Sequence, residues 1–90
     1  MTNPKSRNDV LDTLRTILNE DRAASYGDAK ENFARIAKLW SAYLDVVPID
    51  AKDVAIMMAL VKVSRLAHSK EHDDSWIDIA GYAALGYECP

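Results

Sequence analysis

Two pairs of charged residues in the second half of the chain have a spacing that suits binding chemistry. Asp74 and Asp78 stand at positions i and i+4, so both carboxylates lie on one face of a helix. Carboxylates so placed can share a divalent cation such as Mg²⁺, which prefers oxygen ligands. The segment Ser75-Trp76-Ile77-Asp78 also fits the capping box of a helix N-terminus, where acidic residues need no metal. The residues alone leave both interpretations open.

The second pair is basic. Lys62 and Arg65 stand at i and i+3 and interrupt an otherwise apolar helix. Arg as a bidentate donor and Lys as a point charge can hold a phosphate. Both residues also lie in the last turns of that helix, where cations complement the helix dipole and their stems pack along apolar neighbours. Phosphate binding and dipole compensation are therefore alternatives of equal weight.

A further polar group surrounds the first predicted turn, Ser25-Tyr26-Gly27-Asp28. Arg22 precedes this turn and Asn32 lies one helical turn beyond it. Tyr26 can stack on a base, and Asn32 can bind the edge of a base or a sugar hydroxyl. The ordinary alternative is that Tyr26 packs against the following helix and that Asn32 forms hydrogen bonds on a helix face.

The remaining reactive side chains indicate no catalytic site. His68, His72 and Asp74 fall in or around a predicted loop, without the tight ligand spacing of a zinc site, and a solvated loop is the better interpretation. No serine stands in a G-x-S-x-G elbow. We expect Cys89, the penultimate residue, to be mobile and unsuited to nucleophilic catalysis. A single cysteine cannot form an internal disulfide, which favours a reducing compartment.

Apolar residues recur with helical periodicity in four segments, at 8–24, 28–44, 51–68 and 75–85. We expect Asn8, Asp28 and Asp50 to cap the first three segments and Ser75 the fourth, which should end before Gly86. These segments predict an all-α protein, a compact bundle of about four helices in one domain at 8–87, after a disordered 1–7.

The centre of the third segment, Val54–Val61, is apolar on every side. A helix of this kind lies in the middle of a bundle or in a subunit interface. Because 90 residues provide few neighbours to cover it, we expect a homo-oligomer, most simply a homodimer.

Composition narrows the class of protein further. Eleven Lys plus Arg against 14 Asp plus Glu give a formal net charge of −3, which makes direct nucleic-acid binding unexpected. The longest apolar run has eight residues, too short to span a bilayer. We therefore expect a soluble protein of the cytosol, with no membrane partner.

Several short motifs are distributed between Arg22 and Tyr87. They are Tyr26-Gly27-Asp28, Asn32-Phe33, Asp53-Val54-Ala55-Ile56-Met57-Met58, Lys62-x-x-Arg65 and His72-x-Asp74-Ser75-x-x-Asp78-x-x-Gly81-Tyr82-Ala83. Together they resemble a family of small, uncharacterised helical proteins encoded by bacteriophages and prophages. This resemblance implies an origin in a phage or prophage and a location in the cytosol of the host bacterium.

More remotely, the order of these motifs is similar to phage nucleotide-modification-associated domains and to MazG-like all-α nucleoside triphosphate pyrophosphohydrolases. That similarity implies Mg²⁺ on Asp74 and Asp78, with Lys62 and Arg65 near the phosphates. The segment 28–35 departs from the E-E-x-x-E motif of MazG-like enzymes, because it has one Glu and one Asp separated by a Lys. Binding without hydrolysis fits these residues better.

Two functions follow as expectations. The first is binding, or processing, of a nucleotide-derived ligand, with Arg22, Lys62 and Arg65 on the phosphates and Tyr26 and Asn32 on the base or sugar. The alternative is a non-enzymatic interaction module that binds or inhibits a host protein, since an acidic surface suits a basic partner.

Overall fold

The computed structural model describes residues 6–21, 29–45 and 48–90, and in these residues every regular element is a helix. Helix α1 spans Arg7–Thr16 and continues into a π-helical turn, η1, at Ile17–Asp21. Helices α3, α4 and α5 span Ala29–Leu44, Ala51–His68 and Asp73–Glu88. The predicted all-α class is confirmed, and Arg22, Tyr26 and Gly27 lie outside the described residues.

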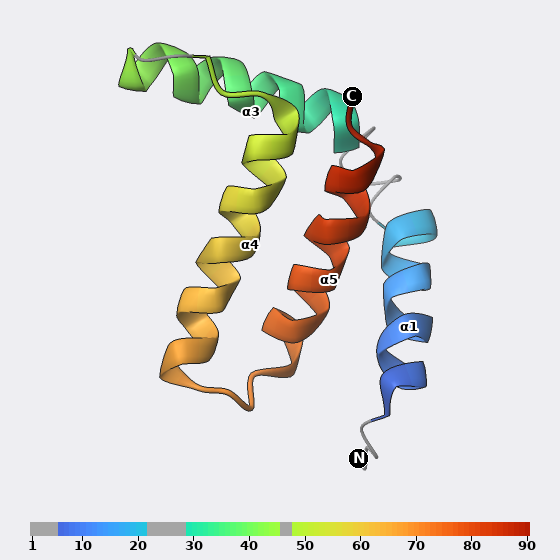
Figure 1. The fold of residues 1–90 in the computed structure, drawn as a ribbon. Coiled ribbons are helices and arrows are strands. Elements are labelled where there is room, and N and C mark those ends of the chain that lie inside the picture. The colour runs from blue at the N-terminus through green and yellow to red at the C-terminus, as the bar shows by residue number, and fades with distance from the viewer. Residues whose placement is uncertain (1–5, 22–28, 46–47) are drawn as a thin grey trace.

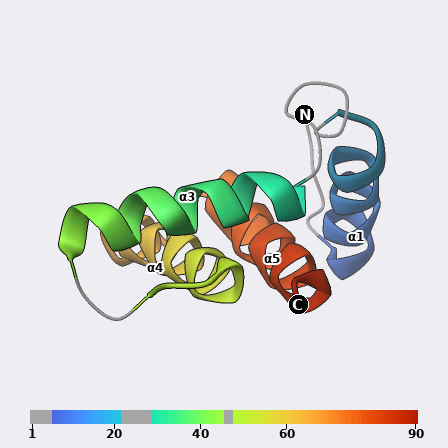
Figure 2. The same ribbon diagram turned by 90° about the horizontal axis from the view of Figure 1, so that it is seen from above.

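Helices α4 and α5 form an antiparallel hairpin that has the most extensive contact in the protein (Figure 1). Helix α3 crosses one end of this hairpin, while α1 lies beside α5, on the side away from α4 (Figures 1 and 2). The hairpin is therefore covered by α3 near one end and by α1 along one edge. Nothing in the arrangement of the described helices covers the outer side of α4.

The core lies where α3 meets the hairpin. Its buried members are Phe33, Ala37, Val54, Ala55 and Cys89, and residues such as Trp40, Met58 and Leu85 pack around them. Phe33 also faces Tyr82, with the ring centroids 6.2 Å apart. This cluster joins α3, the first turns of α4 and the C-terminal end of α5, so it holds the three helices together.

The expected mobility of Cys89 is contradicted by this core. The side chain is only 4% exposed, and its thiol donates to the carbonyl of Leu85 at 3.4 Å. An unpaired cysteine behaves as a small apolar residue when buried. Position near the end of a sequence was therefore a poor guide to order here.

Side-chain caps set the start of two helices. Asp50 caps α4 as predicted, because its carboxylate accepts the Asp53 backbone N–H at 2.8 Å and the Asp53 carboxylate accepts the Asp50 N–H at 3.0 Å. Helix α1 is capped by Ser6 with Asp9, two residues before the predicted Asn8. The serine and aspartate form a complete capping box, which satisfies two backbone donors together.

The prediction for the last helix was wrong at both ends. Helix α5 begins at Asp73 rather than at Ser75, and its N-cap is His72. It also continues through Gly86 to Glu88. A Cβ on Gly86 would lie 2.7 Å from the Cβ of Ala55, so this glycine permits close contact between α4 and α5 and does not end the helix.

Other ends depend on local hydrogen bonds. Asp45, with φ of 52°, ends α3 and donates its N–H to the Ser41 carbonyl at 2.9 Å. The Ser41 hydroxyl accepts the Ile49 N–H at 2.8 Å and so fixes the entry to α4. Lys52 reaches the last turn of α5 and donates to the Gly86 carbonyl at 2.9 Å. These contacts hold α4 against both neighbours.

Candidate functional site

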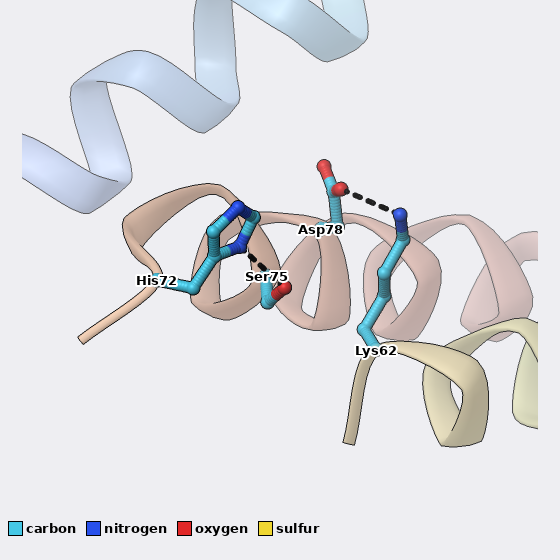
Figure 3. A network of polar contacts seen from close by, with 4 residues as sticks. All are labelled: Lys62, His72, Ser75 and Asp78. Atoms are coloured by element: carbon cyan, nitrogen blue, oxygen red, sulfur yellow. Dashed lines mark hydrogen bonds and ion pairs between the residues drawn. The ribbon is translucent and has the colours of Figure 1, made fainter. Parts of the chain in front are cut away.

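A small polar network crosses from α4 to the first half of α5 (Figure 3). The Lys62 ammonium lies 3.3 Å from a carboxylate oxygen of Asp78, and the two side chains are 21% and 28% exposed. Lys62 was predicted to hold a phosphate and Asp78 a metal ion. The structure pairs the two residues with each other in an ion pair between facing helices, and both ligand roles stay predictions.

The second half of the network is a His72–Ser75 pair. The Nδ1 atom of His72 lies 2.7 Å from the Ser75 hydroxyl, and the donor depends on the histidine tautomer. Ser75 is fully buried, so its hydroxyl cannot reach a substrate despite the adjacent imidazole. The pair therefore fixes the turn that enters α5. His72, predicted to belong to a solvated loop, is half-buried and has this defined partner.

The other predicted ligands lie apart from this network. Arg65 and Asp74 are exposed on α4 and α5. Within residues 6–21, 29–45 and 48–90, no group of three or more His, Cys, Asp or Glu side chains gathers at a possible metal position. The Mg²⁺ role of Asp74 and Asp78 remains a prediction.

Asn32 is half-buried in the first turns of α3, beside the buried Phe33. No hydrogen bond or ion pair of the described residues joins it to Lys62, Arg65, Asp74 or Asp78. The role of Asn32 on a base or sugar thus gains no supporting contact. Tyr26, its predicted partner in this role, and Arg22, predicted to contact the phosphates, are outside the described residues.

The cavity beside Asp78 is too small for a nucleotide. It lies between α5 and the α1–η1 segment and is lined mainly by apolar side chains, including Leu14, Leu18 and Ile77. Its volume of about 10 Å³ is at most that of one water molecule. The contact of α1 with α5 is therefore nearly closed in this structure.

A much larger groove lies between α4 and α5. It has a volume of about 390 Å³, and every residue that lines it comes from these two helices and the Gly86–Tyr87 end of α5. The lining is Lys52, Ala55, Ile56, Ala59, Leu60, Tyr82, Ala83, Gly86 and Tyr87. Only Lys52 carries a charge, so the groove suits an apolar occupant.

Sequence reasoning did not identify this groove as a site, although one signal was present. Val54–Val61 is apolar on every side, whereas a bundle helix usually shows one apolar stripe. In the structure Val54 and Ala55 enter the core, while Ile56 and Leu60 are 59% and 58% exposed. The apolar residues of α4 that exceed one core-facing stripe therefore lie on the surface.

The fold and these contacts describe a small all-α protein with an apolar groove between α4 and α5. None of the described helices is long and apolar enough to cross a membrane. Comparison with known proteins gives the family: residues 9–90 match the Domain of unknown function (DUF6378), and the chain belongs to this family.

Two phage proteins are similar to the chain. It is 49% identical over 76 residues to the Gene 55 protein of Mycobacterium phage L5, covering 84% of this chain and 49% of that protein. It is 39% identical over 74 residues to the Gene 55 protein of Mycobacterium phage D29, covering 82% of this chain and 48% of that protein. The chain thus spans about half the length of these relatives.

The resemblance to a family of phage proteins is thereby confirmed. The more remote likeness to MazG-like enzymes and nucleotide-modification-associated domains stays a prediction. No solved structure matches the chain.

Proposed function

We propose that this protein is a non-enzymatic interaction module whose α4–α5 groove accepts an apolar helix of another protein chain. The groove itself supports this proposal most strongly. It is 390 Å³ in volume, is lined almost entirely by apolar and aromatic side chains, and is bordered by the exposed Ile56, Leu60 and Tyr87. An amphipathic helix laid in such a groove is a common mode of protein recognition.

The energetics favour a protein occupant. Burying one exposed Ile or Leu side chain contributes about 1.5–3 kcal/mol, so two or three such residues provide a strong driving force. Exposed apolar patches of this kind are uncommon on monomeric soluble proteins and mark binding surfaces. Host proteins of the bacterial cytosol are the partners we expect for a phage module.

A matched pair of variants tests the proposal in lysate from the host bacterium. Leu60 is 58% exposed at the groove, and Leu11 is 54% exposed on α1, on the other side of α5. We expect wild type and Leu11→Glu to retain a stoichiometric protein partner, either a second copy of the chain or a host protein. Leu60→Glu should lose this partner, because only this variant places a charge in the groove. The proposal would be refuted if both variants retained the partner equally. It would also be refuted if neither the variants nor wild type retained any partner.

A second candidate is binding of a nucleotide-derived ligand, as the remote resemblance implies. Lys62 supports it, because this ammonium sits at the α4–α5 boundary with Arg65 exposed one turn along α4. A phosphate would replace Asp78 as the partner of Lys62, and Asp78 with Asp74 would then be released toward Mg²⁺. Arg22, Tyr26 and Asn32 complete this proposed site. Hydrolysis is not part of it.

Thermal unfolding against a panel of nucleotides and cyclic nucleotides, with and without Mg²⁺, tests this candidate. A ligand at a hundred times its Kd stabilises a protein by about 2.7 kcal/mol, which is visible as a rise in Tm. We expect Arg65→Ala to remove the rise without unfolding the protein, because Arg65 is exposed. No rise with any member of the panel would exclude the nucleotide function.

A further inference from the structure

We infer that the helix bound at the α4–α5 face is α4 of a second copy of this chain, antiparallel to the first about a two-fold axis. The inference rests on the proposed function, because it names the partner of the same face. It is carried by the spacing of exposed residues on α4, by the residues beside them and by the charges at the two ends of the helix.

Four exposed apolar residues form a stripe along α4, which we call the α4 seam: Ile56, Leu60, Val63 and Ala67. Their separations of four, three and four residues are those of positions a and d in a heptad repeat. At 100° per residue they fall within an arc of about 60°. None of them belongs to the buried core of the chain. The α4 seam has the pattern of a coiled-coil surface.

The surroundings of the α4 seam allow close approach of a second helix. Ala59 and Ser64 flank it with small side chains, and Met57 is a flexible apolar neighbour. Lys52 lies one turn before Ile56, just beyond the α4 seam, and its ammonium donates to the Gly86 carbonyl. The other Lys and Arg residues on α4, Lys62 and Arg65, project from the opposite half of the helix circumference at 100° per residue. Two copies of the α4 seam therefore meet without opposing like charges along its length.

Charge at the ends of α4 favours the antiparallel arrangement. Asp53 lies in the first turn, and Arg65 and His68 lie in the last. A two-fold axis that places Ile56 opposite Ala67 and Leu60 opposite Val63 also sets the acidic first turn of each α4 beside the basic last turn of the second copy. In a parallel pair, Asp53 would instead face Asp53 of the second copy, and the two helix dipoles would point in the same direction, which is unfavourable.

The α5 side of the groove extends the same contact surface. Ala83 and Tyr87 line the groove next to Ile56 and Leu60, and Tyr87 is 86% exposed. The protein measures 47 × 30 × 19 Å, so a broad face has room for the roughly 800 Å² per partner of a standard interface. Two hairpins packed in this way make a four-helix bundle, in which the α4 seam becomes core.

The mass of the purified protein in solution tests the inference. Sedimentation equilibrium should give twice the chain mass of 10.0 kDa for wild type and for Leu11→Glu. Leu60→Glu should raise the dimer Kd at least about a hundredfold, because its charge would be buried without a partner. Circular dichroism of each variant reports whether the helices remain. A folded wild-type monomer at high concentration would overturn the inference.

Cysteine substitutions distinguish the two arrangements. In a Cys89→Ala background, a mixture of Ile56→Cys and Ala67→Cys chains should form a mixed disulfide dimer on oxidation. Ile56→Cys alone should not, because its two copies would lie about 16 Å apart along antiparallel helices. Efficient Ile56→Cys self-linking would overturn the antiparallel arrangement. A different result is a wild-type monomer that binds a host protein, with this binding lost in Leu60→Glu. That result would overturn the inferred dimer and leave the proposed function intact.

Discussion

At the scale of single residues, Gly86 shows how one missing Cβ sets the distance between helices. A Cβ at position 86 would lie closer to the Cβ of Ala55 than two such atoms can approach. The glycine therefore allows α4 and α5 to come this close together. Gly81 lies on the same helix, where an added Cβ would make an ordinary van der Waals contact, 3.5 Å from a methyl carbon of Leu14. The two glycines therefore have different physical roles, although the sequence presents them alike.

Substitution by alanine should separate these roles. We expect Gly86→Ala to destabilise the protein by about 1–3 kcal/mol, because the helices must move apart. Gly81→Ala should be neutral or stabilising by up to about 1 kcal/mol, because alanine favours a helix over glycine. Urea unfolding followed by circular dichroism measures both values. Similar effects at the two positions would contradict the assigned role of Gly86.

Cys89 gives a second test at this scale. Because its thiol is buried in the core, we expect it to react slowly with a thiol reagent in the native protein and rapidly in denaturant. The ratio of the two rates, followed by absorbance, reports opening of the α5 terminus. Equal rates in buffer and in urea would place Cys89 outside the core.

At the scale of elements, the limits of α4 could be predicted because they depend on local chemistry. The Asp50-x-x-Asp53 capping box determines the start of α4, and the predicted segment 51–68 coincides with the helix. The start of α5 could not be found in the same way. Ser75 resembles an N-cap in sequence, but it is buried against His72, and this burial depends on the tertiary structure.

The candidate site shows the same division. The helical spacings of Lys62 with Arg65 and of Asp74 with Asp78 were visible in the sequence. Their partners were not, because the Lys62–Asp78 pair joins two helices whose relative rotation depends on core packing. The sequence of α4 has more apolar residues than one core-facing stripe requires. The structure shows which of them stay exposed outside the core, and these form the α4 seam.

A double-mutant cycle on Lys62→Met and Asp78→Asn tests the contribution of the ion pair. We expect a coupling free energy of about 0.5–1 kcal/mol, reduced by added salt, because both side chains are partly exposed. The free energies of unfolding from urea titrations give the coupling. A coupling of zero would remove the pair from the forces that align α4 with α5.

At the scale of the whole molecule, α4 has more apolar surface than the other described helices cover. Helix α3 covers one end of the hairpin and α1 covers the outer edge of α5, but the α4 seam stays exposed. Because burial of apolar surface drives association, this imbalance is the physical basis of both the proposed interaction function and the proposed dimer.

Photo-cross-linking through the α4–α5 face is the most direct test of the interaction function. A photoreactive amino acid placed at Leu60 should link the chain to another protein chain, a second copy in the purified protein or a host protein in cell lysate. The same group at Leu11, equally exposed on α1, should give little product. Strong linking at Leu60 alone is the result we predict. Equal linking at both positions, or none at Leu60, would contradict the assignment of this face as the binding surface.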